Sequence, residues 1–293
     1  MKRIFAILAC LLCVLVLNAQ GIIVRKPSKK QPTTQTTTAA KKQTTTTKPA
    51  KKISATTSST NSNRQRILQE LADHMVYVQG GTFTMGATSE QGSDAEDDEK
   101  PAHSVTLSSY YIGKTEVTQE LWQAVMGSNP SYHKGDRKPV ENVSWEDCRT
   151  FISKLNSLTG KKFRLPTEAE WEFAARGGIK SKGYKYSGSN SFGDVAWYLN
   201  NSGDTTHDVG TKSPNELGLY DMSGNVCEWC NDWYGNYISS PSNNPTGPSS
   251  GTCRVIRGGS WNDIARYCRS SDRDGITPDN RGNFLGLRLC LSE

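Results

Sequence analysis

The first sixty residues of the chain contain no aspartate or glutamate, although they hold eleven lysines and arginines. Taking these eleven from the 35 basic residues of the chain leaves 24 against 29 acidic residues, a net charge of −5 for the remainder. The overall charge of +6 therefore belongs to the N-terminal part of the sequence. An acidic balance in the rest gives no electrostatic support for nucleic-acid binding, so we expect no nucleic-acid partner.

The sequence also lacks an apolar run long enough for a comfortable membrane span. Its longest apolar run, from Ile4 to Leu17, follows two basic residues and ends shortly before Ala19 and Gln20. This order predicts a signal peptide over residues 1–19 and a mature chain that starts near Gln20. We therefore expect a secreted, periplasmic or cell-surface protein, with no transmembrane helix left after cleavage. An uncleaved anchor is an alternative, as is a lipoprotein modified at Cys10, whose apolar core would be unusually short.

Apolar residues are almost absent from the stretch that follows, which consists mainly of Thr, Lys, Pro, Gln and Ser. Such a segment cannot bury enough surface to fold, so residues 20–63 are predicted to be a disordered tether. Residues 64–293 are long enough for one sizeable domain with its own core, and they contain no internal repeat.

Short helices and strands with clear start and turn signals are predicted for the first half of this domain. Thr118, Ser144 and Thr167 each precede a helical pattern, and Thr167 forms a capping box with Glu170. The expected elements are a lead-in helix over 64–73, a β-hairpin over 75–86 with a Gly-Gly turn, a solvated acidic loop over 94–99, strands over 105–107 and 110–112, and helices over 119–126, 145–156 and 168–176.

The last forty residues follow neither a helical nor a strand period. The segment from Arg254 to Cys290 contains the frame Arg257-Gly-Gly-Ser-Trp261 and four further arginines at short intervals: Arg266, Arg269, Arg273 and Arg281. We expect an irregular segment held by arginine hydrogen bonds and glycine turns, and functional sites often lie on such segments.

Seven sequence blocks occur in order along the domain: GGTFTMG, TEVTQELW, PVENVSW, RLPTEAEWEFAARGG, GLYDMSGNVCEWCNDWY, RVIRGGSW and LGLRL. Together they resemble the formylglycine-generating enzyme, or sulfatase-modifying-factor, domain over about residues 75–291. The resemblance implies an irregular α+β domain of the C-type-lectin-like superfamily. Ergothioneine-synthase-type relatives add an N-terminal helical domain with an iron-binding histidine cluster. We do not expect that branch here, because a Lys-Thr tether occupies that place and the four histidines are scattered.

The resemblance also implies a calcium-binding loop at Asp221, Gly224, Val226 and Glu228. Carboxylate and carbonyl oxygens on a tight, glycine-containing loop suit Ca²⁺. The expected ion is structural. A polar loop held by hydrogen bonds without metal is the alternative.

The oxidase chemistry of the resembled family requires two cysteines that bind copper(I), the first three residues after Gly-Gly-Ser and the second five residues later. In this chain those positions are Asp263 and Cys268. A carboxylate is a poor ligand for copper(I), so a copper site is not expected. Ser260 matches the family's active-site serine, and Cys268 and Ser260 therefore remain the candidate catalytic residues.

Six cysteines follow the signal peptide, an even number that suggests three disulfides among fifteen possible connectivities. The resemblance implies Cys148–Cys290, and we expect Cys230–Cys268 and Cys227–Cys253 for the others. Cys227 and Cys230 also form a C-x-x-C pair, but they lack the βαβ context of a thioredoxin-like redox motif.

Frame residues and the positions between them together form a candidate ligand-binding surface. Its members are Trp261, Asn262, Asp263, Tyr267, Arg269, Arg273, Asn280 and Phe284. The residues between the frame positions are all reachable from an AAC codon by changing its adenines, as in variable proteins of diversity-generating retroelements, although ordinary loop divergence also explains them. We therefore expect a non-canonical family member that binds a protein, peptide or glycan ligand through residues 260–284. The alternatives are a formylglycine-generating oxidase, which acts on a Cys-x-Pro-x-Arg sequence, and a retroelement-diversified binding protein.

Overall fold

The computed structural model describes residues 62, 64–71 and 73–293, and the three predicted capped helices are present in it. In α3 (Gln119–Met126) the Thr118 hydroxyl accepts the Leu121 amide at 3.3 Å. The helices α4 (Trp145–Thr159) and α5 (Glu168–Ala175) both begin with complete capping boxes. Local capping chemistry therefore sets these starts, as predicted.

The predicted lead-in helix is also present, because residues 64–71 and 73 are helical. The predicted signal peptide and nearly all of the predicted tether lie outside the described residues. Within the described residues, no helix is both long enough and apolar enough to cross a bilayer.

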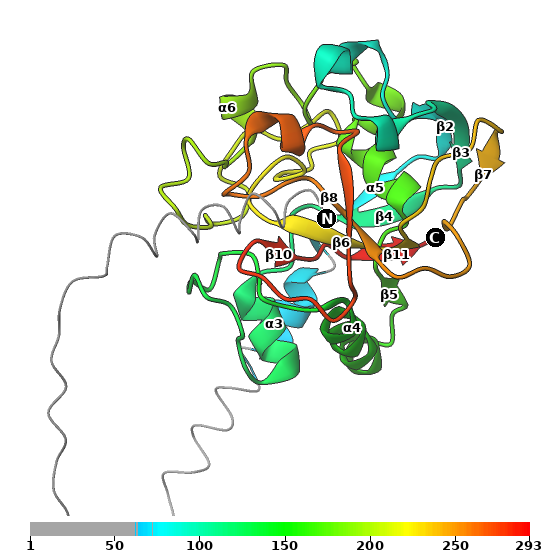
Figure 1. The fold of residues 1–293 in the computed structure, drawn as a ribbon. Coiled ribbons are helices and arrows are strands. Elements are labelled where there is room, and N and C mark those ends of the chain that lie inside the picture. Colours follow the sequence, from blue (N-terminus) through cyan, green and yellow to red (C-terminus); the bar gives the residue numbers. More distant parts are fainter. Residues whose placement is uncertain (1–61, 63, 72) are drawn as a thin grey trace, which may run out of the picture. The chain divides into compact units, whose positions relative to one another are not determined.

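In the described part of the chain, eleven short strands form three small sheets, with strand orders β1-β4-β11-β5, β10-β6-β8-β9 and β2-β3-β7 (Figure 1). The strands are β1 (Met75–Val78), β2 (Gly81–Met85), β3 (His103–Leu107), β4 (Tyr110–Gly113), β5 (Phe163–Arg164), β6 (Cys227–Trp233), β7 (Ser242–Asn243), β8 (Arg254–Arg257), β9 (Arg273–Ile276), β10 (Leu285–Gly286) and β11 (Cys290–Ser292). The single-turn elements are η1 (Ser89–Asp94), η2 (Asp97–Glu99), η3 (Gly178–Lys180), α6 (Phe192–Val195) and η4 (Ala265–Cys268). This mixture of short helices and strands is the predicted irregular α+β fold.

The predicted hairpin over residues 75–86 is wrong, although both of its strands exist. β1 pairs with β4, whereas β2 pairs with β3 in another sheet. Gly80 and Gly81 therefore carry the chain from one sheet to the next. A Cβ on Gly80 would lie 2.4 Å from the Leu107 carbonyl oxygen, so glycine is needed there because another backbone passes too closely.

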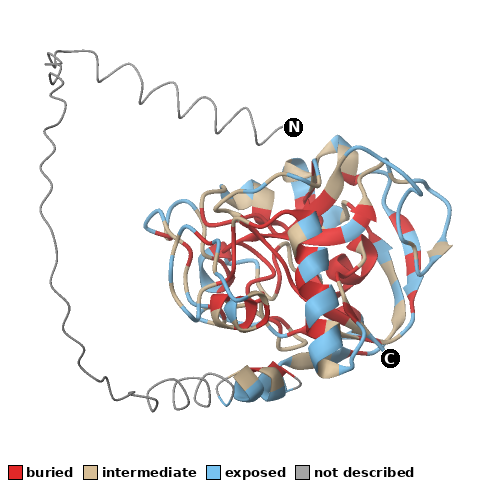
Figure 2. Cartoon of the chain, turned by 90° about the horizontal axis from the view of Figure 1, so that it is seen from below, coloured by how far each residue is buried: buried red, intermediate tan, exposed pale blue. Residues whose placement is uncertain are grey.

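The helix α5 occupies the centre of the domain, and every residue in it is buried. Trp171 and Phe173 from this helix pack with residues of β1, β3 and β4 in one hydrophobic cluster. A second cluster joins α3 and α4 to β6 and the C-terminal strands. Buried residues accordingly gather in the interior, while exposed residues follow the loops and the outer helix faces (Figure 2). The terminal segment 254–290 crosses this core.

Candidate functional site

A tight glycine turn places Ser260 at the start of the candidate site. Gly258 and Gly259 have φ values of 93° and 68°, which favour glycine. A Cβ on Gly259 would lie 2.5 Å from the Cys268 Sγ and 2.6 Å from the Tyr267 carbonyl oxygen. The two glycines therefore allow β8 to turn directly beneath η4, and Ser260 is buried at that turn.

Asp263 occupies the position of the first copper cysteine and is hydrogen-bonded to Ser260. The Ser260 hydroxyl lies 2.7 Å from Asp263 Oδ2 and 2.6 Å from Asn262 Oδ1. This geometry ties the predicted catalytic serine to a carboxylate, a hard oxygen ligand that suits copper(I) poorly.

Two cysteines lie close to this cluster. Cys227 Sγ is 3.9 Å from Asp263 Oδ2, and Cys268 Sγ is 3.8 Å from the Ile264 carbonyl oxygen. The structure thus brings the predicted residues Ser260, Asp263 and Cys268 together. It adds Cys227, which the sequence indicated only as a disulfide candidate.

Aromatic rings from a distant segment border the turn. The Trp261 indole donates to the Asn283 carbonyl oxygen at 2.9 Å, and its ring meets His133 edge-on at 5.0 Å. His133 in turn meets Tyr132 at 4.9 Å, and Tyr132 is 73% exposed. Trp261 itself is largely buried, so Tyr132 presents most of the accessible aromatic surface.

Two exposed aliphatic residues flank the same turn. The Leu199 amide donates to the Asp263 carbonyl oxygen at 3.0 Å, which places Leu199 beside Ile264. Leu199 is 43% exposed and Ile264 is 47% exposed. We define the 260-turn patch as Tyr132, His133, Leu199, Trp261 and Ile264.

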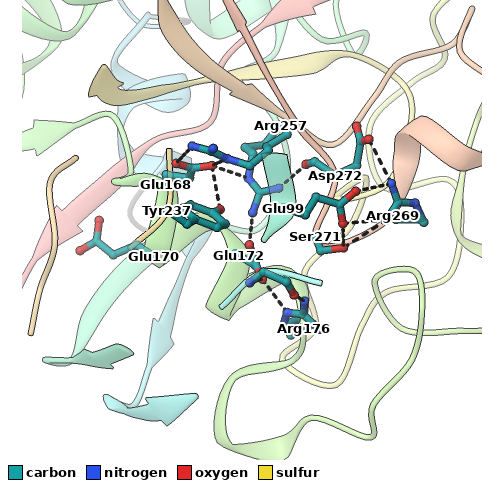
Figure 3. Close-up of polar contacts among 12 residues, drawn as sticks. Glu99, Glu168, Glu170, Glu172, Arg176, Tyr237, Arg257, Arg269, Ser271 and Asp272 are labelled. Carbon is teal, nitrogen blue, oxygen red and sulfur yellow. Dashed lines mark hydrogen bonds and ion pairs between the residues drawn. The ribbon is translucent and has the colours of Figure 1, made fainter. Parts of the chain in front are cut away.

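Arg269, predicted to belong to the ligand-binding surface, is instead completely buried. Its guanidinium forms a bidentate pair with Glu99, at 2.6 Å for Nη2–Oε1 and 2.8 Å for Nη1–Oε2 (Figure 3). Ser271 donates to the same carboxylate at 2.6 Å. Glu99 is also fully buried, so the prediction of a solvated acidic loop over 94–99 fails at its last residue.

Arg273, also predicted to lie on the binding surface, is buried as well. It pairs with both carboxylate oxygens of Glu168, at 2.7 and 2.8 Å. Arg257 joins the same network, because it contacts Glu172, lies 3.6 Å from Glu168 and donates to the Asp272 carbonyl oxygen (Figure 3). These arginines hold the terminal segment onto α5 and η2 and do not face solvent.

The network lowers the pKa of two of its carboxyl groups, those of Glu99 and Glu168. Burial raises the pKa of Glu99, but hydrogen bonds from Arg269 and Ser271 outweigh it, and the net pKa lies below the usual range. Glu168 behaves similarly: burial raises its pKa, but the charge of Arg273 and its hydrogen bond, together with the charge of Arg257 and the hydrogen bond from Tyr237, lower the net pKa below the usual range. Ionised pairs at the base of the segment therefore support the turn above them.

The remaining predicted surface residues are half-buried: Asn262, Asp263, Tyr267, Asn280 and Phe284. Phe284 packs against the hydrophobic cluster of α3 and α4. The triplet Ser270-Ser271-Asp272, which lies between frame residues, is buried as well. The accessible part of the predicted surface is therefore narrower than residues 260–284.

No disulfide bond joins any of the six cysteines that the structure describes, so the three predicted pairs are not formed. Cys227 and Cys253 lie at opposite ends of the β6–β8 ladder, in which Glu228 pairs with Arg257 and Trp233 pairs with Arg254. At about 3.3 Å per residue these ends are roughly 15 Å apart, well beyond the reach of a disulfide.

The other two predicted pairs, Cys148–Cys290 and Cys230–Cys268, each link cysteines that pack in different hydrophobic clusters. Burial of each thiol among apolar side chains accounts for these positions without a covalent bond.

The residues of the predicted calcium loop do not fit the ion in this arrangement. Arg288 pairs with both oxygens of Glu228, at 2.7 and 3.0 Å, and the Trp171 indole donates to Glu228 at 2.7 Å. Asp221 Oδ2 accepts the Gly210 amide at 2.7 Å. Burial raises the pKa of Asp221 to about 6. The guanidinium of Arg288 thus supplies the positive charge at this loop, and calcium binding stays a prediction that the geometry does not support.

Comparison with known proteins places this geometry in a family. The sulfatase-modifying factor enzyme 1-like domain model matches residues 60–292. This chain belongs to that family. The chaperone protein LppX of Paenibacillus barcinonensis is 34% identical, over 76% of this chain and 91% of that protein. The formylglycine-generating enzyme of Streptomyces coelicolor is 31% identical, over 73% of this chain and 88% of that enzyme.

A solved structure of the same sulfatase-modifying-factor fold also matches. Treponema denticola variable protein 1 is 37% identical and aligns with a TM-score of 0.68, covering 75% of this chain and 95% of that protein. The predicted family and fold class are therefore confirmed.

Several residues of the site carried no local signal in the sequence. Tyr132, His133 and Leu199 lie in loops of ordinary composition, and tertiary packing brings them to the turn. The acidic partners of the buried arginines were also missed. Four closely spaced arginines in an irregular segment were the available clue, because fully buried arginines require ionic partners.

Proposed function

We propose that this chain binds a protein or peptide segment at the 260-turn patch and does not oxidise it. The observation that carries the proposal is the patch itself, in which exposed Tyr132, Leu199 and Ile264 surround a turn whose metal position holds Asp263. Exposed aromatic and aliphatic side chains suit peptide side chains better than the hydroxyl groups of a glycan.

The buried arginine pairs support a binding role because they make the scaffold rigid. Arg257, Arg269 and Arg273 hold both ends of the turn through bidentate or multiple contacts. A preorganised surface loses less conformational entropy when a ligand binds. The half-buried His133 ring lies between Tyr132 and Trp261 and so belongs to the same surface.

The names of the relatives agree with a binding role. LppX is named as a chaperone, a class of protein that acts on other protein chains, and the Treponema structure is named as a variable protein. A fixed frame with changeable residues between its members is what a diversified binding surface needs. We also propose, from the predicted signal peptide, that the chain acts outside the cytoplasm.

To test the proposal, a displayed peptide library is selected for binding to the full chain. The dissociation constant of the best peptide is then measured by fluorescence anisotropy for the wild type, Tyr132→Ser and Ile264→Ser. We expect roughly tenfold weaker binding for each variant, because central aromatic and apolar contacts carry most interface energy. Tyr77→Ser, at a tyrosine 46% exposed on β1, is the matched control. Enriched peptides that bind Tyr132→Ser as tightly as the control would overturn the proposal, as would selective binding of glycans.

A second candidate function is the family's cysteine oxidation, favoured by one observation. Ser260 and Cys268 keep the family's positions, and Cys227 places another sulfur 3.9 Å from Asp263. Copper(I) supplies oxygen activation in that chemistry and prefers thiolate ligands. The full chain incubated with copper(I), oxygen and a Cys-x-Pro-x-Arg peptide would convert the peptide cysteine if this candidate were right. An unchanged peptide mass rejects it.

A further inference from the structure

A cavity lies beside the loop that joins β6 to β7, and a buried carboxyl group lines it. Its volume is about 380 Å³, within the usual range for small-molecule sites. Met85, Trp233, Tyr237 and Ile238 line it with apolar and aromatic surface. Ile238 is 65% exposed at this loop, so a large apolar side chain lies at the cavity and also faces solvent.

Ionisation of Asp232 gives the cavity lining one negative charge more than its basic side chain balances. Its lining holds two carboxyl groups, from Glu168 and Asp232, and one guanidinium, from Arg273. Arg273 is committed to Glu168 through a bidentate pair and also stacks on Tyr237 at 4.0 Å. Asp232 is only 3% exposed, and no basic residue in the described part of the chain forms an ion pair with it.

Asp232 accepts a backbone hydrogen bond and also lines the cavity. Its Oδ2 accepts the Glu168 amide at 3.1 Å. On its other side the loop backbone approaches closely, since a Cβ on Gly247 would lie 3.2 Å from Asp232 Oδ1. Gly247 also lines the cavity, so Asp232 sits at the junction of helix α5, strand β6 and this loop.

We propose that this cavity binds a small organic ammonium ion, whose charge pairs with the Asp232 carboxylate while its apolar part contacts Trp233 and Ile238. Buried carboxylates normally have a counter-ion, and here the ligand supplies it. Aromatic walls add a favourable environment for a cation. This site is separate from the 260-turn patch, and it does not depend on the function proposed for that patch.

The protonation of Asp232 gives the site a characteristic pH dependence. Burial, followed by the nearby charge of Glu168, raises the pKa of Asp232 to about 8 in the empty cavity. The ionisable groups around Asp232 are Glu168 and Glu170 on α5, Arg254 on β8, Arg273 on β9, Cys230 on its own strand and His103 on β3. Because an ammonium ion needs the ionised carboxylate, binding releases a proton below pH 8, and affinity rises roughly tenfold per pH unit between 6 and 7.5.

Titration of the full chain with benzylammonium and butylammonium tests the proposal, with neutral benzyl alcohol as the isosteric control. The Met85 methyl group lines the cavity, so its NMR signal reports binding at this place. We expect both amines to shift that signal, with the predicted pH slope, and benzyl alcohol to leave it unchanged. Absence of a shift with either amine, equal binding of the alcohol, or affinity that falls as pH rises would overturn the proposal.

Two variants distinguish the role of the Asp232 carboxylate in amine binding from its role in folding. Asp232→Asn retains an acceptor for the Glu168 amide and resembles the protonated native side chain, so we expect it to fold and to lose amine binding at least tenfold. Asp208→Asn, at an exposed aspartate, is the matched control and should bind normally. Unchanged amine affinity in Asp232→Asn would overturn the assignment of the carboxylate. If that variant fails to fold, Ile238→Ala replaces it, with several-fold weaker binding expected and unchanged affinity contradicting the site.

Discussion

Glu99→Gln tests how strongly the buried arginine pairs hold the terminal segment. The substitution keeps the shape of the side chain but leaves the Arg269 guanidinium without its bidentate partner. Both side chains are fully buried, so solvent does not screen the loss. Removing one partner of a buried pair typically costs about 3–5 kcal/mol of unfolding free energy. For a domain of this length that corresponds to a decrease of roughly 10 °C in Tm.

Urea unfolding of the full chain measures this cost, and an exposed ion pair supplies the control. Arg281 and Asp147 pair at 2.7 Å with side chains 50% and 34% exposed, so Arg281→Gln should cost no more than about 1 kcal/mol. The double variant Glu99→Gln/Arg269→Met should recover part of the loss, because it removes the uncompensated charge. A loss below about 1 kcal/mol in Glu99→Gln would refute the reasoning.

Three further predictions concern acid stability, the glycine turn and calcium. The pKa of Glu168 in the folded domain lies below the ordinary value of 4.5. The stabilisation by ionised Glu168 is therefore present above pH 4.5 and is lost as the pH falls through the folded pKa. In Glu168→Gln the free energy of unfolding should depend less on pH in this acidic range. Gly259→Ala should destabilise the domain by about 1–3 kcal/mol more than Gly127→Ala. Both glycines have a positive φ, but a Cβ on Gly259 would lie 2.5 Å from the Cys268 Sγ, whereas nothing lies within 4 Å of a Cβ on Gly127. EDTA should leave the Tm unchanged because Arg288 already pairs with Glu228, and a Tm that rises with added calcium would contradict this.

The sequence indicated the parts of the fold that depend on neighbouring residues. Thr118, Ser144 and Thr167 were predicted as caps because a capping side chain bonds an amide within three residues. The predicted hairpin failed because the choice of partner for β1 depends on β4 and β11, which lie far along the chain. Pairing between strands that are distant along the chain has no signature in the local sequence.

The candidate site shows the same difference between residues that the sequence indicates and residues whose contacts depend on distant segments. Ser260, Asp263 and Cys268 were identified from the resemblance to the formylglycine-generating family, and they do lie together. Arg269 and Arg273 were assigned to the surface because they lie within residues 260–284. Their partners Glu99 and Glu168 are more than a hundred residues away in sequence, so no local pattern indicated the buried pairs.

A single experiment tests most directly whether the 260-turn patch binds without oxidation. A selected peptide that also contains Cys-x-Pro-x-Arg is incubated with the full chain, copper(I) and oxygen, and both its retention and its mass are measured. Our account predicts that the peptide is retained with an unchanged mass, and that Tyr132→Ser loses the retention while Tyr77→Ser keeps it. Conversion of the peptide cysteine to an aldehyde, or retention that is equal in all three proteins, would contradict the account.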